Sequence, residues 1–331
     1  MTDRQNKVSR NSKSKESIDT LPDEILNDLP KLGSVTDRFG NTFYFGNAGG
    51  YWQPPFRIGA DTDYMTHARN IRDMEIRPDD VMICSYPKTG LHWHREIVTM
   101  LMNKTSSLST KIDDTICALE KKPIHVFSSR ESPRLINTHV PFRYLPKQAL
   151  KKKIKIIFLD RNPKDVLVSA YSHLKKTVHP FNYPGTFEQF VYLNLEVGHM
   201  FGHLFTYLMD RQEGIDANPD VPFFTSVYED MILDTKAGVK KLNEFLGTGC
   251  SEELCEKIAE ACSFDSMKPF KEANATINES VWFRNREIGY YRKGAVGDWK
   301  NWFTEDLNEE FDREYKKHMA DYRTVYKYSL E

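Results

Sequence analysis

Short apolar runs alternate along this chain with longer segments in which apolar residues recur every three to four positions. A short continuous apolar run is typical of a strand that is buried on both faces, whereas the longer spacing is typical of a helix with one buried face. The pattern predicts strands at Val81–Ser85, Arg134–Asn137, Lys155–Leu159 and Phe223–Val227. It predicts helices at Leu91–Asn103, Pro163–Lys176, Phe187–Arg211, Lys236–Leu246, Glu252–Ala261 and Glu305–Asp321.

This alternation of strands and helices indicates an α/β fold. We predict a single domain with a mostly parallel central β-sheet that is flanked by helices on both faces. No repeat period and no linker rich in glycine, serine or proline divides the sequence, so the domain is expected to span residues 21–331. Residues 1–20 are polar and charged and are expected to form a disordered tail.

Charge and cysteine content narrow the classes of function. The chain has 331 residues, of which 46 are basic and 47 acidic, so it has no overall field that would recruit nucleic acid or an anionic membrane. No apolar run is long enough to cross a membrane, and the first residues have no apolar signal core. The five cysteines include no Cys-x-x-Cys pair, which favours a reducing compartment. We expect a cytoplasmic protein with no metal, membrane or nucleic-acid partner.

The loop between the first predicted strand and its helix has the features of a phosphate site. Lys88, Thr89 and Gly90 come soon after the strand, and the helix begins at Leu91. The first N–H groups of a helix have no partner within it, and the helix dipole is positive at that end. Lys88 adds a positive charge at the same place. The glycine spacing differs from that of a Walker A loop, so we describe the unit as P-loop-like.

Two further strand ends carry candidate chemistry. His139 follows the second strand, and an imidazole there can act as a general base because its ordinary pKa lies near neutrality. Arg161 follows the third strand and Ser169 lies two turns along the next helix, so the two can grip a second phosphate. The simpler alternatives are a structural histidine and an Arg161–Asp165 ion pair beside a helix cap.

The remaining clusters add an aromatic ring and more positive charge. Tyr228 follows the fourth strand and can stack on a nucleotide base. Arg292 and Lys293 precede Gly294 and can form a mobile cationic clamp over an anion. A helix start at Glu229 and Asp230 and an ordinary surface loop are the simpler alternatives. Each alternative is tenable alone, but chance does not explain all five clusters together.

In this order, the clusters resemble the cytosolic sulfotransferase family. The matching segments are Tyr86–Trp93, Arg161–Ser169 and Arg292–Lys300, and the resemblance extends from about Arg77 to the end of the chain. It implies a sulfotransferase fold and an enzyme that transfers the sulfuryl group of PAPS, releasing PAP, to the hydroxyl or amine of a small acceptor. It implies no metal.

The resemblance also assigns roles to residues. Lys88, the backbone from Thr89 to His92 and the start of the helix would hold the 5′ phosphate–sulfate of PAPS, and Lys88 would neutralise charge on the leaving PAP. His139 would be the general base, with Asn137 and Ser169 as further catalytic residues. The rest of the nucleotide site would comprise Arg161, Ser169, Arg292, Lys293 and Gly294 around the 3′-phosphate and Trp93, Tyr228, Cys262 and Phe264 around adenine.

Several positions depart from the family pattern. Leu91 and His92 replace two threonines that would donate hydroxyl groups to phosphate, and Cys262 replaces a threonine near adenine. Asn137 stands where many members have a lysine beside the catalytic histidine, and an amide cannot neutralise charge. These changes leave open an alternative, namely a catalytically weak or silent protein that binds PAP or PAPS. An ATP-dependent phosphotransferase is disfavoured because its glycine spacing is missing.

The acceptor and the oligomeric state are less constrained. The aromatic residues expected to line the acceptor pocket suggest a small hydrophobic alcohol, phenol or amine; they are Tyr64, Phe142, Trp282 and Phe283. The family's dimerisation signature is present at Lys300, Thr304 and Glu309, but Glu305 places a charge where an apolar residue is usual. We therefore expect a monomer or a weak homodimer.

Overall fold

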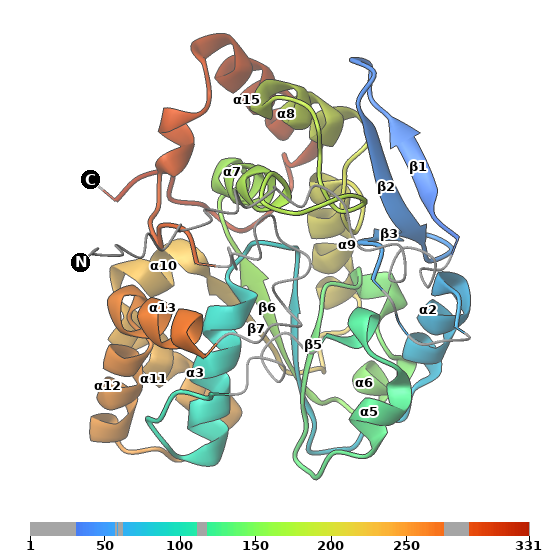
Figure 1. Ribbon diagram of the computed structural model, residues 1–331. Helices are drawn as coiled ribbons and strands as arrows, with labels where there is room; N and C mark the ends of the chain where they lie inside the picture. The colour runs from blue at the N-terminus through green and yellow to red at the C-terminus, as the bar shows by residue number, and fades with distance from the viewer. Residues whose placement is uncertain (1–30, 57, 59–61, 111–117, 275–290, 331) are drawn as a thin grey trace, which may run out of the picture.

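A four-stranded parallel sheet forms the centre of the molecule (Figure 1). The computed structural model describes residues 31–56, 58, 62–110, 118–274 and 291–330. The strands are β4 (Val81–Ser85), β5 (Leu135–Thr138), β6 (Lys155–Asp160) and β7 (Phe223–Val227), in the order β5-β4-β6-β7. All three pairings are parallel, which confirms the predicted sheet. The carboxyl ends of the strands therefore share one edge.

Helices cover both faces of this sheet, as predicted. On one face, α3 (Leu91–Asn103), α11 (Thr235–Leu246) and α12 (Glu252–Ala261) bury their apolar sides against Ile83, Ile157 and Leu159. On the other face, α7 (Pro163–Leu174) packs with Cys84 and Phe158 in the larger core. Because successive side chains of a strand point to opposite faces, one short apolar strand contributes side chains to both cores.

A smaller antiparallel sheet, which the sequence pattern did not reveal, packs beside the larger core. It consists of β1 (Gly33–Thr36), β2 (Thr42–Asn47) and β3 (Trp52–Gln53). Phe45 of β2 stacks on Trp52 of β3 with ring centroids 4.4 Å apart. These strands are too short to give a clear alternating pattern.

The segment predicted as one helix, Phe187–Arg211, is two helices. They are α8 (Phe187–Glu196) and α9 (Leu204–Asp216), and the prediction of a continuous helix is wrong. Gly198 and Gly202 between them both have φ of 92°, a left-handed conformation that is unavailable to a continuing α-helix. The break creates a loop, residues 197–203, and two residues of this loop line the cavity described below.

The remaining elements are further α-helices and short 3₁₀ helices around these layers. They are α2 (Tyr64–Asp73), η1 (Leu119–Lys121), α5 (Ile124–Ser128), η2 (Phe142–Tyr144), α6 (Lys147–Lys151), α10 (Tyr228–Leu233), α13 (Phe264–Ala273), η4 (Asp298–Asn301) and α15 (Glu305–His318). Several are shorter than the window that reveals helical periodicity. None of the helices in the described ranges is long and apolar enough to cross a membrane.

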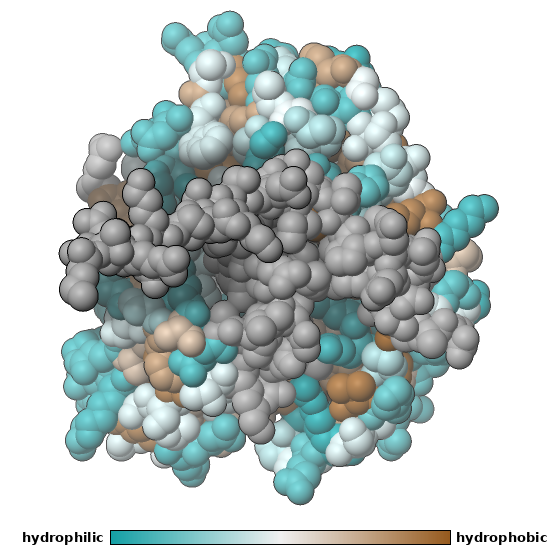
Figure 2. Space-filling model, viewed as in Figure 1, coloured by the Kyte–Doolittle hydropathy of each residue, from teal (hydrophilic) through white to brown (hydrophobic). Residues whose placement is uncertain are grey.

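The described surface on the face shown in Figure 2 is mainly hydrophilic, and its apolar residues are scattered. The predicted tail, residues 1–20, lies outside the described residues.

Candidate active site

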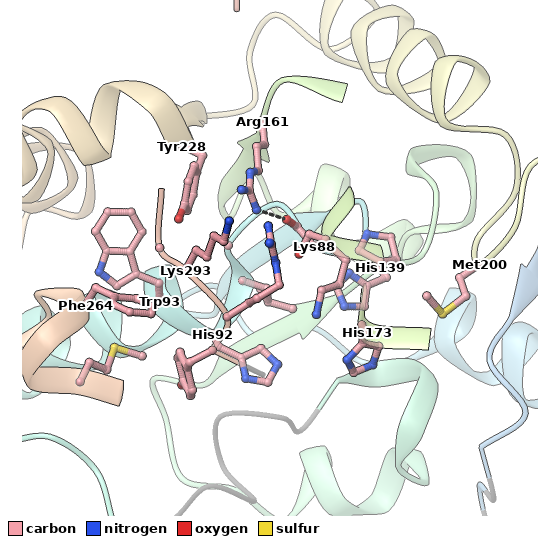
Figure 3. A pocket seen from close by; sticks show the side chains of 18 of the residues that line it. Lys88, His92, Trp93, His139, Arg161, His173, Met200, Tyr228, Phe264 and Lys293 are labelled. Carbon is pink, nitrogen blue, oxygen red and sulfur yellow. Dashed lines mark hydrogen bonds between the residues drawn. The ribbon is translucent and has the colours of Figure 1, made fainter. Parts of the chain in front are cut away.

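A cavity with an empty volume of about 1290 Å³ opens at the carboxyl ends of β4, β5 and β6. Its lining comes from the loop before α3, from α7, from the loop between α8 and α9, from the start of α13 and from residues 291–295 (Figure 3). The cavity therefore joins segments that lie far apart in the sequence.

The loop that opens α3 has the geometry of an anion cradle. Lys88 and Gly90 adopt positive φ angles of 73° and 102°, and Gly90 is the N-cap of α3 without a side-chain cap. The Thr89 hydroxyl donates to the Tyr86 carbonyl at 2.8 Å and holds the turn. A Cβ on Gly90 would lie 3.0 Å from the Tyr228 ring, so only glycine allows this close approach. The uncapped N–H groups of the helix start are left for a ligand.

The Lys88 ammonium group in this loop can lose its proton near neutral pH. Burial and the neighbouring charge of Arg161 lower the pKa of Lys88 to about 7. A bound anion would favour the charged form of the ammonium group.

Arg161 bridges the loop, the clamp segment and an aromatic ring. Its guanidinium donates to the carbonyls of Lys88 (3.1 Å) and Ala295 (3.3 Å) and lies 4.3 Å above the Tyr228 ring. The carboxylate of Asp165 instead accepts hydrogen bonds from the backbone N–H groups of Gly297 and Trp299. The alternative of an Arg161–Asp165 ion pair is therefore wrong, and the Arg161 guanidinium remains directed at the cavity.

The clamp cations share one carboxylate. Lys293 Nζ lies 2.5 Å from Asp298 Oδ1, and Arg292 pairs with Oδ2 of the same residue. Burial alone would raise the pKa of Asp298, but hydrogen bonds from Lys293, Asn301 and Arg292 hold it below its ordinary value. A Cβ on Gly294 would lie 2.2 Å from the Phe264 ring, so glycine is needed where the clamp meets this ring.

Three aromatic rings form the wall beside the clamp. The Trp93 and Tyr228 rings are 5.6 Å apart at 71°, and Phe264 also lines the cavity (Figure 3). Trp93 Nε1 donates to the Cys262 carbonyl at 2.8 Å, which fixes the indole. Aromatic faces held in this way suit a planar nucleobase.

His139 projects into the cavity beside Lys88 (Figure 3). Its Nδ1 lies 2.7 Å from the Ser85 carbonyl oxygen. A carbonyl can only accept, so Nδ1 carries the hydrogen and Nε2 keeps its lone pair. Burial lowers the pKa of His139 to about 3, an effect partly offset by the Ser85 carbonyl and strengthened by the charges of Lys121 and Lys88. The imidazole is neutral at physiological pH and is positioned as a proton acceptor.

Comparison with known proteins identifies the family. The model for the "Sulfotransferase domain" family matches residues 78–323. The chain belongs to this family. It is a PAPS-dependent sulfotransferase.

The comparisons extend over most of the chain. Sulfotransferase 1E1 of Bos taurus is 35% identical over 285 residues, covering 83% of this chain and 93% of the relative. The amine sulfotransferase of Oryctolagus cuniculus is 33% identical over 260 residues, covering 76% of this chain and 84% of the relative. Mouse sulfotransferase SULT7A1, solved in complex with PAP, has a TM-score of 0.66 at 25% identity, with 89% of this chain and 96% of that chain covered. A retinol dehydratase structure has a TM-score of 0.69 at 18% identity and covers 94% of this chain and 98% of that chain, which supports the fold alone.

The structure brings most of the residues predicted for the nucleotide site, and the predicted base His139, to one cavity. Those that line it are Lys88, Gly90, Leu91, His92, Trp93, His139, Arg161, Ser169, Tyr228, Cys262, Phe264, Arg292, Lys293 and Gly294. Thr89 lies behind the loop, where its hydroxyl holds the turn. Burial and the charges of Lys121 and Lys88 keep the pKa of His92 well below its ordinary value, so this imidazole is neutral in the free protein near neutral pH.

Three predicted site residues lie elsewhere. Asn137 is fully buried under α3, where its Oδ1 accepts a hydrogen bond from Arg95 at 3.0 Å, and it does not line the cavity. Tyr64 and Phe142 belong to the core rather than the acceptor pocket: Tyr64 packs over Gly46, and Phe142 packs against Phe158. Trp282 and Phe283 lie outside the described residues.

Other lining residues were not found from the sequence. The loop after α8 supplies Met200 and Phe201, and the pair Gly198 and Gly202 was the signal that could have revealed it. His173 lies four residues after Ser169 in α7, and this spacing places both on the same side of the helix. Pro54, Phe56 and Lys121 come from segments without a motif, and only the fold brings them to the cavity.

Glu120 holds the backbone at His139 in place through two hydrogen bonds. Its Oε2 accepts from the Thr138 hydroxyl at 3.0 Å, and its Oε1 accepts from the His139 backbone N–H at 3.2 Å. The carboxyl is fully buried, and burial raises its pKa. These bonds hold the end of β5 and thereby position His139. In the described ranges, no group of three potential metal ligands is present.

Proposed function

We propose that this sulfotransferase moves the sulfuryl group of PAPS to the hydroxyl or amine of a small hydrophobic acceptor by in-line displacement, with His139 as the general base. The observation that carries the proposal is the hydrogen bond from His139 Nδ1 to the Ser85 carbonyl. It leaves Nε2 as a proton acceptor in the same cavity as Lys88.

The donor site fits PAPS in charge and shape. Lys88 and the N–H groups at the start of α3 would hold the 5′ phosphate–sulfate, and Arg161, Ser169 and the Arg292–Gly294 clamp would hold the 3′-phosphate. Trp93, Tyr228 and Phe264 would enclose adenine, with Cys262 behind the Trp93 indole. None of the described residues that line the cavity is acidic, which suits a polyanionic donor.

The division of labour follows from these positions. His139 Nε2 takes the acceptor proton while the acceptor oxygen or nitrogen bonds to sulfur and the bond from sulfur to the bridging oxygen breaks. The Lys88 ammonium neutralises the charge that develops on that oxygen. A general base of this kind contributes roughly 10²–10⁴-fold to the rate. Asn137, held under α3 by Arg95, has no part in this step.

The acceptor side of the cavity supports a hydrophobic substrate. Pro54, Phe56, Met200 and Phe201 line it, and the Phe201 ring lies 5.3 Å from the His139 ring. An aromatic or aliphatic acceptor would pack against these side chains while its hydroxyl or amine faces His139.

A weak or silent PAP-binding protein is the second candidate. Leu91 and the neutral His92 lack the threonine hydroxyl groups of the family pattern, and the buried Asn137 stands in place of the lysine that many members have beside the catalytic histidine. This would lower transition-state stabilisation without removing the nucleotide site.

The proposed assembly and compartment rest on simpler features. We keep a monomer or weak homodimer as the proposal: Thr304 caps α15 through the Leu307 N–H, and Glu305 is exposed in the first turn of that helix. We also keep the cytoplasm as the proposed compartment, which is supported by the free thiols of Cys84, Cys250, Cys255 and Cys262.

The test replaces His139 with alanine. We expect kcat to fall roughly 10²–10⁴-fold with phenol and amine acceptors, because proton removal is lost, while the Kd for PAP stays unchanged. Steady-state kinetics and calorimetric titration with PAP, run beside ATP, measure the two effects. Replacing the exposed His125 with alanine is the matched control and should change neither quantity.

The outcomes separate the candidates. Full activity of the His139→Ala enzyme would refute the assigned base. Tight PAP binding by the wild-type chain without turnover of any phenol, alcohol or amine would favour the silent protein. Failure to bind PAP would refute the donor site.

A further inference from the structure

A buried ion pair joins the helix that begins at the anion cradle to the helix that carries part of the aromatic wall. Lys271 Nζ of α13 donates to Glu96 Oε2 of α3 at 2.8 Å, and each side chain is only 1% exposed. Lys271 Nζ also donates to the Ser109 carbonyl at 2.8 Å, and the Ser109 N–H donates to Glu96 Oε1 at 2.6 Å. Taking two charges out of water costs free energy that an apolar pair would not incur, so stability alone does not account for this pair.

The helix that carries Lys271 depends on tertiary contacts for its position. α13 has ten residues and includes Pro269, which has no N–H to donate to the preceding turn. A helix this short is marginal by itself even without such a gap. Lys271 comes two residues after the proline, so its bonds to α3 fix the part of α13 that follows the interruption.

One face of α13 carries both this anchor and the cavity wall. Phe264, Met267 and Lys271 follow the spacing i, i+3 and i+7, which places them on the same side of a helix. Phe264 and Met267 line the cavity, whereas Lys271 is buried against α3, which lies alongside (Figure 1). A rotation or shift of α13 at Lys271 would therefore move the Phe264 ring.

The facing side of α3 has the same arrangement. Trp93, Glu96 and Met100 lie on one side of this helix by the same spacing. Trp93 Nε1 donates to the Cys262 carbonyl at 2.8 Å, and Cys262 Sγ lies 3.7 Å from Met100 Sδ, shortly before α13 begins. The chain that enters α13 is thus held at Cys262, and the ion pair holds the other end. The two attachments together fix the position of Phe264 relative to Trp93.

The groups proposed for the phosphates and for proton transfer have separate attachments. Arg292 and Lys293 pair with Asp298, and the segment around Asp298 is bonded to Asp165 of α7. His139 follows β5, whose end is held by other hydrogen bonds. The ion pair between α3 and α13 therefore bears on the aromatic wall and not on these groups.

We propose that Glu96 and Lys271 are positioning residues for the nucleobase of the donor. They hold α13 on α3 so that Phe264 and Met267 contact the adenine ring. Neither Glu96 nor Lys271 lines the cavity, so both act through the position of the helix. This inference rests on the proposed function and adds a determinant of donor recognition at the same site. The transfer step is unchanged.

The test compares PAP with methyl riboside 3,5-bisphosphate, which has both phosphates but no base. The wild-type protein should bind PAP more tightly in calorimetric titrations. Lys271→Met should weaken PAP binding about tenfold, the loss expected when one aromatic ring no longer stacks on a base, and should leave the affinity for the abasic compound unchanged. The KM for PAPS should rise while kcat is unchanged, because Lys88 and His139 keep their places.

A second variant and a control separate positioning from folding. Lys271→Met leaves Glu96 buried without its charged partner, so the double variant with Glu96→Met removes both charges and should restore the melting temperature. It should still bind PAP as weakly as the single variant, because an apolar contact lacks the directionality of the two lysine hydrogen bonds. Lys257→Met breaks an exposed ion pair with Glu253 on α12 and should change neither stability nor binding.

Two results would overturn the inference while leaving the proposed function intact. The first is a folded double variant that binds PAP as tightly as the wild type, which would mean that the ion pair serves stability alone. The second is an equal loss of affinity for PAP and for the abasic compound in Lys271→Met, which would place the effect at the phosphates. Failure of the wild-type chain to bind PAP would instead refute the proposed function.

Discussion

The protonation state of Lys88 is set by the groups around it and differs from that of an ordinary lysine. It is half-buried beside Arg161, and the loss of solvent and the charge of Arg161 bring its pKa to about 7, far below the ordinary value for lysine. Near neutral pH the free protein is therefore a mixture of charged and neutral Lys88. A nucleotide phosphate at the same place shifts the mixture to the charged form.

We predict that PAP binding takes up a proton above pH 7. The free protein loses the Lys88 proton as pH rises through about 7, whereas the complex keeps it to higher pH, so PAP affinity should fall by up to about tenfold per pH unit in this range. Calorimetry at pH 8 in buffers of different ionisation enthalpy measures the uptake directly.

Lys88→Met should weaken PAP binding and remove the proton uptake, and the exposed Lys151→Met should do neither. An affinity that is constant from pH 7 to 9 would contradict the assigned pKa of Lys88.

At the scale of elements, the break between α8 and α9 builds part of the acceptor wall. The loop returns to β3 through a hydrogen bond from the Phe201 N–H to the Trp52 carbonyl at 2.6 Å. Phe201 itself has a φ of 63°, an unfavourable value for a bulky residue, and its ring contacts His139. Backbone strain of this kind persists where the surrounding contacts hold it, and here it places an apolar ring beside the base.

The two glycines of this loop should differ in their response to alanine. Both have a φ of 92°, which costs a non-glycine residue about 1–2 kcal/mol. A Cβ on Gly202 meets no atom within 4 Å, whereas a Cβ on Gly198 would lie 2.5 Å from backbone atoms of Gly202 and His203. Gly198→Ala should therefore lose about 1–3 kcal/mol of unfolding free energy beyond the loss in Gly202→Ala.

Urea denaturation measures both losses, with Gly202→Ala as the matched control. The Gly198→Ala enzyme should also show a raised acceptor KM, because Met200 and Phe201 are displaced. Equal losses in the two variants would mean that the loop relaxes around the added methyl group.

At the scale of the whole molecule, the C-terminal segment is tied to the central sheet through Asp160. This residue ends β6, next to Arg161, and is fully buried. Its carboxylate pairs with Arg211 of α9 at 2.6 Å and accepts hydrogen bonds from Tyr322, Thr324 and Tyr326. One carboxylate thus joins a sheet strand, a helix and the end of the chain directly behind the proposed phosphate site.

We predict that Asp160→Asn destabilises the protein strongly. The change leaves the buried Arg211 guanidinium without a charged partner, and breaking a buried pair in this way typically costs about 3–5 kcal/mol. Asp216→Asn removes an ion pair to Arg323 in the same region, but both of its side chains are at least half exposed, so its loss should stay below about 1 kcal/mol.

Urea denaturation of the two variants, with and without PAP, measures the difference. If Asp160→Asn costs no more than Asp216→Asn, the Asp160 cluster does not hold the C-terminal segment.

The sequence predicted the central elements closely and the peripheral ones poorly. β4, β7, α3 and α12 have the predicted bounds, because continuous apolar runs and clear helical spacing belong to the sequence itself. The split at Gly198 was missed because the apolar spacing continues through the break. Asn137, Tyr64 and Phe142 were misplaced because an aromatic or polar residue near a motif can point to the core as readily as to a cavity.

By itself, the sequence determined the fold class, the family and the set of cationic and aromatic residues proposed for the nucleotide. These depend on local motifs at strand ends, and a parallel sheet necessarily brings such ends to one edge. Only the tertiary structure decided the tautomer of His139, the pKa of Lys88, the neutrality of His92 and the presence of Lys121 beside Phe56. These properties arise from burial and from neighbours distant in the chain, so no local pattern of residues can encode them.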